Sequence, residues 1–296
     1  MAIVDIIQLP LEKTEKNCFY FLWVFDKIYL QKIRIVLHNR LKTLCLILFF
    51  LPVSIYAQAL EEPPTKNINQ QFQTWISLNS VFQLTNHWSG LADLHIRRTN
   101  LAKDPSFNFI RFGARYGFND NLKLSAGYAH LWLAKDENWT LFLNENRIYQ
   151  EFILADTWPT FSGLFRIRTE QRFFNNVEDG LSLEDNYFIN RIRFLLSITV
   201  PFKKAGKTSF LVANEIHLNF GKEVVFNTFD QNRFTVGIKQ KIDKSWSFDC
   251  GYMLVYQQLP SDTDYNLNHT FRLFFYGNFD LRKNRNKLIE HGQTID

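Results

Sequence analysis

From about residue 71 to about residue 279, the chain repeats short segments in which apolar or aromatic side chains alternate with polar ones. The segment 191–201 is the clearest case. Ile192, Phe194 and Leu196 fall on one face of this segment, and Arg191 and Arg193 fall on the other. Side chains of a β-strand point alternately to its two faces, so the pattern predicts strands with one apolar and one polar face.

Eleven segments show this pattern, and each is long enough to cross a bilayer at a tilt, which takes about 9–11 residues. The predicted strands are 71–84, 91–100, 107–118, 122–133, 145–156, 163–174, 187–201, 208–220, 230–242, 246–257 and 268–280. Bacterial single-chain barrels have even strand numbers, and an odd number would force the first and last strands to pair in parallel. We therefore expect an all-β fold: a transmembrane, antiparallel, up-and-down β-barrel of twelve strands, with ten as the alternative.

The gaps between the predicted strands alternate in length. Short gaps are expected at 85–90, 119–121, 157–162, 202–207 and 243–245, and long polar gaps at 134–144, 175–186, 221–229 and 258–267. Outer-membrane barrels have short periplasmic turns and long external loops, so the alternation favours this class.

The chain before the strands resembles a secretory leader. Basic residues precede the apolar run 44–50, and Ala57 is a small residue suited to cleavage, so we predict a signal peptide at 32–57. We expect residues 1–31 to be a mis-called N-terminal extension that results from a misplaced start codon. We further expect a disordered lead-in at 58–70, the barrel at 71–280 and a polar tail at 281–296. A single N-terminal anchor helix is the alternative for the leader.

Composition supports the same location. Phenylalanine contributes 30 residues and aromatic residues 16% of the chain, as expected for a lipid-facing wall with aromatic girdles. The segment 1–57 holds seven of the 34 basic and four of the 29 acidic residues, so the remainder carries a net charge of only +2. This balance gives no support for nucleic acid as a partner. Cys250 is the sole cysteine after residue 57, which excludes an internal disulfide there.

If the apolar faces meet lipid, the polar faces line the interior. The predicted lumen network consists of Arg147, Glu151, Arg166, Arg168, Glu170, Arg172, Arg191, Arg193, Glu215 and Arg233, and Arg111, Arg115 and His217 lie further round the wall. Two interpretations remain open. The charges could pair and fill a structural barrel, or they could line a narrow pore for anionic solutes.

An enzyme is a third class. An outer-membrane lipid hydrolase would need a serine within hydrogen-bond reach of a histidine. His130, His269 and Ser261 are predicted near the outer rim, but nothing in the sequence brings them together. Glu215 and His217 could both bind a metal, although two ligands are a weak signal. We expect no enzyme activity, no metal and no cofactor. A soluble β-barrel or sandwich that binds lipid is the remaining alternative, and it would bury the apolar faces inside.

Five stretches resemble a family of uncharacterised bacterial outer-membrane β-barrel proteins, a domain of unknown function. They are 145–151, 166–172, 214–220, 230–234 and 278–282, and the resemblance covers roughly residues 70–282. It implies a barrel in the bacterial outer membrane and brings no assigned reaction. The last predicted strand, with Phe271, Leu273, Phe275 and Phe279 on one face, resembles the signal read by the barrel-insertion machinery. That machinery and outer-membrane lipid are the expected partners; the oligomeric state is not predicted.

Overall fold

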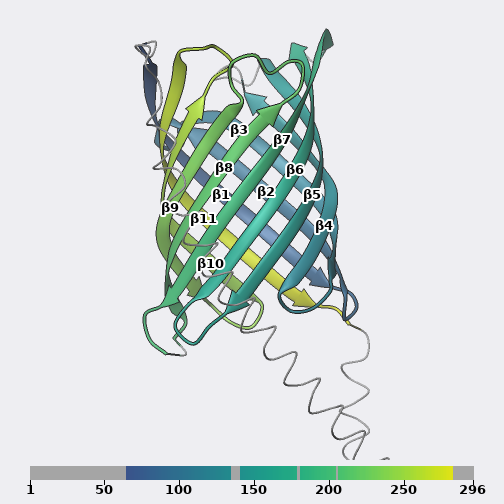
Figure 1. Ribbon diagram of the computed structural model, residues 1–296, viewed down its shortest axis with the longest axis vertical. Coiled ribbons are helices and arrows are strands. Elements are labelled where there is room, and N and C mark those ends of the chain that lie inside the picture. The colour runs from purple at the N-terminus through teal and green to yellow at the C-terminus, as the bar shows by residue number, and fades with distance from the viewer. Residues whose placement is uncertain (1–64, 135–140, 179–180, 205, 283–296) are drawn as a thin grey trace, which may run out of the picture. The chain divides into compact units, whose positions relative to one another are not determined.

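A computed structural model describes residues 65–134, 141–178, 181–204 and 206–282. In these residues the chain forms a closed barrel of eleven strands, drawn in Figure 1. The strands are β1 (Asn67–Gln83), β2 (Trp88–Thr99), β3 (Asp104–Gly117), β4 (Leu122–Ala134), β5 (Leu141–Thr157), β6 (Ser162–Glu178), β7 (Leu181–Pro201), β8 (Thr208–Phe220), β9 (Phe229–Lys241), β10 (Trp246–Gln258) and β11 (Asp264–Asp280). One 3₁₀ turn, η2 (Asn100–Ala102), joins β2 to β3.

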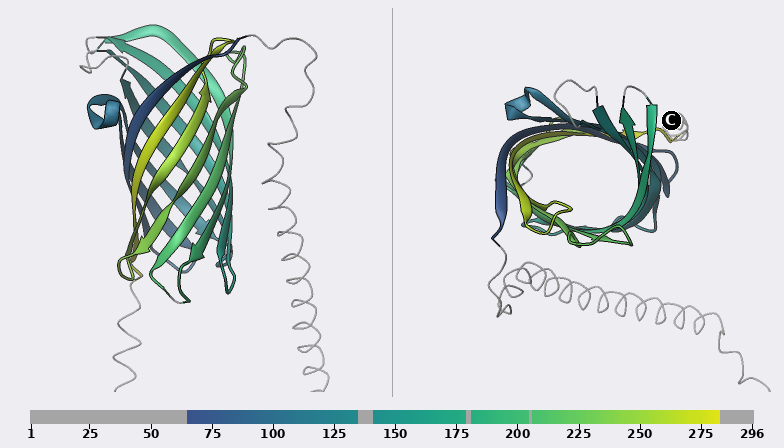
Figure 2. Two further views of the ribbon diagram at one scale, coloured as in Figure 1. Left: turned by 90° about the vertical axis from the view of Figure 1, so that its left-hand side faces the viewer. Right: turned by 90° about the horizontal axis from the view of Figure 1, so that it is seen from above.

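Each strand pairs antiparallel with the next one along the chain, and the exception is the closing pair. The first and last strands, β1 and β11, run parallel from the Asn67–Asp264 pair to the Gln83–Asp280 pair. Figure 2 shows the closed wall of the barrel from the side and from above. The expected even number, twelve or ten, is therefore wrong for the described chain. Eleven consecutive up-and-down strands leave the first and last pointing the same way, and a parallel ladder can still satisfy both edges.

The strand ends differ from the predicted ones mainly where the ladder continues past the apolar pattern. β1 begins at Asn67, so residues 67–70 belong to a strand and not to the lead-in. β6 runs to Glu178 and β7 begins at Leu181, so most of the long gap predicted at 175–186 is strand. Backbone pairing does not require apolar side chains, which is why alternation misses these extensions. The predicted extension, signal peptide and most of the tail lie outside the described residues.

The short connections are fixed by side-chain caps on the backbone. The Oδ1 atom of Asn119 accepts hydrogen bonds from the backbone N–H groups of Asn121 and Leu122 at 2.9 and 2.8 Å. Asp243 does the same for Ser245 and Trp246 at 2.7 and 2.8 Å. Asn and Asp favour tight turns because their side chains replace a backbone acceptor in this way. These caps end β3 and β9 and start the antiparallel return.

Two pairs of glycines face the interior across neighbouring strands. Gly113 of β3 pairs with Gly127 of β4, and Gly237 of β9 pairs with Gly251 of β10. A Cβ atom on Gly127 would lie 2.1 Å from the backbone oxygen of Phe112 and 2.8 Å from the ring of Tyr149. The missing side chains therefore let the strands approach closely and make room for the Tyr149 ring inside the barrel.

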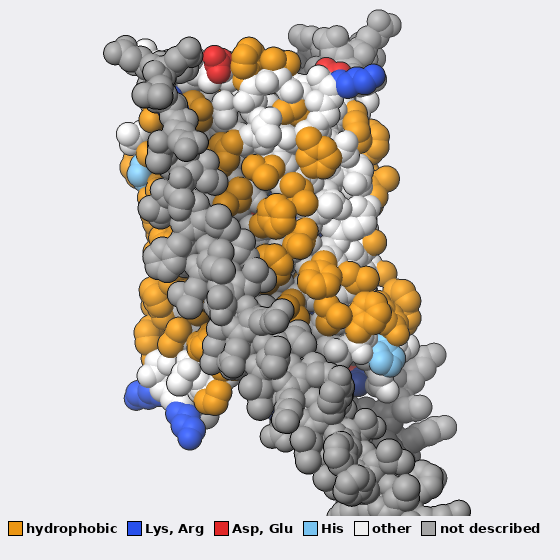
Figure 3. All heavy atoms as spheres, viewed as in Figure 1, with side chains coloured by type: hydrophobic (Ala, Val, Ile, Leu, Met, Phe, Trp, Pro, Cys, Tyr) orange, Lys and Arg blue, Asp and Glu red, His pale blue; other side chains and the backbone are white. Residues whose placement is uncertain are grey.

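The outer surface carries many large apolar side chains, and the interior is mixed. Large apolar side chains that are exposed on the wall include Phe72, Phe112, Ile148 and Phe271. Figure 3 shows apolar side chains, in orange, over much of one face of the barrel. Inside, Trp75, Met253 and Val255 form one buried apolar cluster, and Phe109, Ala129 and Leu131 form another. No helix in the described ranges is long and apolar enough to span a membrane.

Candidate functional site: a charged network in the barrel interior

The ten residues of the predicted lumen network lie on the inner face of five adjacent strands, β5 to β9. They alternate along each strand, as Arg166, Arg168, Glu170 and Arg172 do in β6. The register places like charges opposite each other at two points, Arg147–Arg172 and Arg168–Arg193. Like charges directly opposite destabilise a sheet, so each of these pairs needs a carboxylate nearby.

Glu145 supplies the carboxylate for the first pair. Its Oε2 atom accepts a hydrogen bond from Arg147 Nη2 at 2.8 Å, and its Oε1 atom accepts one from Arg172 Nε at 2.6 Å. The side chain of Glu145 is fully buried. One carboxylate that binds two guanidinium groups turns a repulsive cross-strand pair into a bridged one.

Glu170 supplies the carboxylate for the second pair and is the centre of the network. It accepts hydrogen bonds from Arg191 Nε and Arg193 Nη1, both at 2.8 Å. Arg147 and Arg168 lie at 3.8 and 3.9 Å from its oxygens. Glu170 is only 2% exposed. A buried carboxylate among four guanidinium groups is held by direct bonds that offset its lost hydration.

Glu215 of β8 forms the next junction. Arg193 Nη2 donates to both of its carboxylate oxygens, at 2.8 and 2.9 Å, and Arg166 Nη2 donates at 2.5 Å. Arg233 Nη1 lies 3.7 Å away, and His217 Nε2 lies 3.1 Å away. Glu215 thus connects β6, β7 and β9 across the inner face of β8.

Glu151 of β5 completes the set. It accepts a hydrogen bond from Arg168 Nε at 2.8 Å, and Arg166 and Arg115 lie 3.6 Å away. Together with Glu145, the ten predicted residues therefore form one continuous chain of ion pairs within 4 Å. The contact with Arg115 extends this series of ion pairs from β5 to β3.

The alternating sequence pattern did not identify some of the charged residues in this interior. Glu145 has the same inward parity as Arg147 and could have been found from the strand pattern. Asp230, which accepts a hydrogen bond from Arg191 Nη1 at 2.8 Å, could not. The β8–β9 register shifts between His217 and Leu218, and this bulge turns Asp230 inward out of phase with Gln231 and Arg233.

Two further ion pairs lie on the remaining wall. Arg111 of β3 pairs with Asp93 of β2. Arg272 of β11 donates to both oxygens of Asp249 of β10 at 2.9 Å, and the Tyr276 hydroxyl donates to the same carboxylate at 2.5 Å. The charged interior thus extends to both sides of the closing pair of strands.

A cavity of about 470 Å³ adjoins the network and extends toward the ends of β1, β2, β3 and β10 that carry Gln71, Thr99, Pro105 and Gln257. Its lining is arginine-rich, with nine arginines but only two acidic residues. Other lining side chains are aromatic or apolar, among them Trp75, Phe107, Phe109, Leu131 and Phe274.

The candidate hydrolytic residues are engaged elsewhere. Ser261 Oγ donates to Asp264 at 2.8 Å, while His269 Nδ1 lies 2.7 Å from the Tyr252 hydroxyl. His130 contacts Asn146 at 2.8 Å. Among the described residues, no serine or cysteine hydrogen-bonds to a histidine, and no cluster of three His, Cys, Asp or Glu side chains could hold a metal. His217 meets Glu215 inside the charged network and does not form a separate metal site.

Comparison with known proteins gives a family and no activity. No curated protein matches the chain. A family model described as a protein of unknown function (DUF2490) matches residues 72–266, which begin in β1 and end in β11. The matched segment spans most of the barrel and all ten residues of the lumen network, and the chain belongs to this family of unknown function.

Proposed function

We propose that this chain is an integral β-barrel of the bacterial outer membrane whose paired charges fill the middle of the barrel. One observation carries the proposal: the chain places its charges inside and its large apolar side chains outside. A water-soluble barrel that carries lipid in its interior would have the opposite polarity. Exposed apolar side chains this numerous would cost a soluble protein its solubility.

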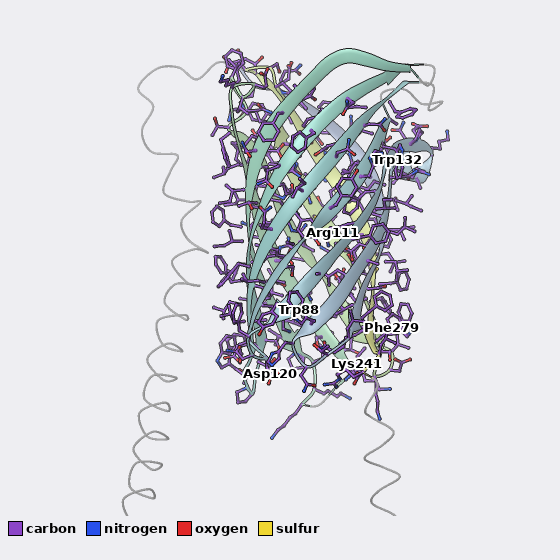
Figure 4. The ribbon with its side chains drawn as sticks, turned by 90° about the vertical axis from the view of Figure 1, so that its right-hand side faces the viewer. Trp88, Arg111, Asp120, Trp132, Lys241 and Phe279 are labelled. Carbon is purple, nitrogen blue, oxygen red and sulfur yellow. The ribbon has the colours of Figure 1, made fainter. Side chains whose placement is uncertain are left out.

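The outer wall also supports the proposal through its aromatic residues. Trp88 and Phe279 lie near the end with the short turns, and Trp132 lies toward the other end, as Figure 4 shows. Aromatic side chains at both ends match the girdles that mark the two interfaces of membrane barrels.

Polar side chains on the outer face bind each other. Thr169 Oγ1 donates to Gln150 Oε1 at 2.6 Å, and Gln150 Nε2 donates to Gln171 Oε1 at 3.1 Å. Lipid offers no water as a hydrogen-bond partner, so a polar side chain there is costly in free energy unless it bonds to another side chain. These mutual hydrogen bonds lower that free-energy cost.

Side chains from non-adjacent strands approach each other inside the barrel, which supports a filled middle. Arg115 of β3 reaches Glu151 of β5. The Arg233 guanidinium of β9 lies 5.0 Å from the ring of Trp75 in β1, across β10 and β11. Small barrels fill their interior with side chains, so we propose a structural, non-enzymatic barrel without steady conductance.

Two measurements test this proposal. Expressed in a bacterium with two membranes, the protein should fractionate with outer-membrane vesicles and resist a carbonate wash. Recovery as a detergent-free soluble protein overturns the location. Reconstituted in planar bilayers, it should show no steady current, and a stable ohmic conductance overturns the filled interior.

A narrow anion pore is the second candidate, and the excess of arginine on the cavity wall favours it. Rings of arginine select anions in pores. If a conductance is found, the double variant Arg166→Gln/Arg168→Gln should reduce its anion preference. Arg98→Gln, which lies off the cavity, should not. An unchanged preference in the double variant excludes this ladder as the selectivity element.

A further inference from the structure

Arg97 stands apart from the other interior arginines. It projects inward from β2 between two aromatic neighbours in register, Trp75 of β1 and Phe107 of β3. Its guanidinium carbon lies 3.3 Å from the centre of the Trp75 ring and 4.0 Å from that of Phe107. Both flat faces of the guanidinium are therefore covered by rings, and its N–H edge remains for a partner.

That edge has no carboxylate partner in the part of the chain that the structure describes. Arg111, four residue pairs further along the β2–β3 ladder, binds Asp93, whereas Arg97 forms no ion pair in the described residues and its buried Nε atom has no hydrogen-bond partner. A buried unpaired cation is costly, so such a group calls for an anion. Arg97 also lines the cavity, which places this anion inside it.

Other polar atoms of the cavity are unsatisfied as well. His95 Nε2, the Tyr149 hydroxyl and Asn268 Oδ1 are buried without a hydrogen-bond partner, and their side chains all line the same space. Orphaned polar atoms that converge on one cavity indicate a site prepared for a polar ligand.

The apolar side chains of the cavity wall on either side of Arg97 define the rest of the ligand. Phe109, Leu131 and Phe274 present rings and methyl groups to the cavity. A volume of about 470 Å³ is within the range of small-molecule sites. An inorganic anion would leave this apolar surface empty, whereas an organic acid would cover it and bring its carboxylate to Arg97.

We propose that the cavity binds a small organic acid: a carboxylate held by the edge of Arg97, attached to an apolar or ring-shaped body that packs on the aromatic wall. The planar guanidinium suits a carboxylate because it can donate two parallel hydrogen bonds. The proposal goes beyond the proposed function, since it gives the interior of a structural barrel a ligand-binding role. Binding itself does not require the barrel to lie in the outer membrane.

The test uses the full chain purified in detergent and benzoate as the probe, with calorimetry as the readout. Benzoate should bind saturably, and its neutral counterpart benzamide should bind at least about tenfold more weakly, since charge-assisted bonds are about twice as strong as neutral ones. Inorganic phosphate should not displace benzoate at equal concentration. Absence of benzoate binding, equal binding of benzamide, or equal competition by phosphate each overturns the proposal.

Two variants locate the site. Arg97→Gln should weaken benzoate binding about tenfold to a hundredfold, the usual effect of losing a charged hydrogen-bond partner. Arg98→Gln is the matched control, because Arg98 bonds to Asn108 at 3.3 Å and does not line the cavity. It should leave binding unchanged. Unchanged binding in Arg97→Gln overturns the assignment.

A third variant covers the case in which Arg97→Gln does not fold, as judged by the heat-dependent mobility shift of folded barrels in gels. Arg97→Lys keeps the charge but loses the planar fork. Its affinity for benzoate should therefore lie between the affinities of the unmodified protein for benzoate and for benzamide. Binding equal to the parent overturns the role of the fork. If the protein proves soluble in the fractionation experiment, the proposed membrane location is refuted, but the benzoate-binding result is unaffected. Failure of the proposed location and failure of the proposed ligand site are therefore distinguishable.

Discussion

At the scale of single residues, the interior depends on carboxylates that are shared among arginines. Glu170 is the clearest case, because two arginines bond to it and two more lie within 4 Å. Replacing it by glutamine would leave these cations without their common counter-ion. Removing one partner of a buried ion pair destabilises a protein by about 3–5 kcal/mol.

We therefore expect Glu170→Gln to lower the free energy of unfolding by about 3–5 kcal/mol in urea titrations of the barrel in lipid vesicles. Glu223→Gln is the control, since Glu223 is exposed in the β8–β9 connection. It should change stability by no more than about 0.5 kcal/mol. A loss below about 1 kcal/mol for Glu170→Gln would show that water in the lumen replaces the carboxylate.

The outer face offers a second residue-scale prediction. Phe112 is 56% exposed and follows Arg111, which lies midway along the barrel in Figure 4. Arginine at the bilayer midplane costs about 2–4 kcal/mol, and about 0–1 kcal/mol near the interface. Phe112→Arg should therefore destabilise the barrel in vesicles by about 2–4 kcal/mol.

Phe118→Arg is the matched control for this substitution, because Phe118 is 51% exposed beyond the end of β3. It should cost no more than about 1 kcal/mol. Equal effects of the two substitutions would contradict a lipid-facing wall at Phe112.

At the scale of elements, the glycine pairs set how closely the strands approach. Gly127→Ala would place a Cβ atom 2.1 Å from the backbone oxygen of Phe112, and backbone cannot move aside as a flexible side chain can. Overpacking of this kind costs about 1–3 kcal/mol, so we expect that loss in urea unfolding. Gly90→Ala should be neutral or slightly stabilising, since its nearest neighbour would lie 4.0 Å away. Tolerance of alanine at both positions would mean that the close approach is not required.

The alternation of apolar and polar residues along the chain was enough to find all eleven strands. Each strand has one apolar face, so apolar residues recur at every second position. β8 was predicted with its observed bounds, Thr208–Phe220. Alternation also put the ten network residues on the polar faces that line the interior. It could not find Asn67–Gln70, where pairing with β11 and not side-chain polarity makes the strand. It also could not find Asp230, because a bulge breaks the period there, or the stacking of Arg97, which depends on register between strands.

At the scale of the whole molecule, the strand number decides where the two ends of the barrel chain emerge. β1 starts beside Asp264, and β11 ends beside Gln83. The two ends of the barrel therefore lie at opposite rims. With an even number of strands they would lie at the same rim. If the barrel spans a membrane as proposed, the parallel pair places these two ends on opposite sides of that membrane.

Epitope tags test this claim directly. A tag inserted before Thr65 should react with antibody on intact cells, and a tag inserted after Arg282 should react only after the outer membrane is permeabilised. This orientation follows if the short turns, which share a rim with the end of β11, face the periplasm. A turn tag between Lys203 and Lys204 is the control and should behave like the tag after Arg282. If both terminal tags react on the same side, the barrel closes with an even number of strands, and the β1–β11 ladder is not its native closure.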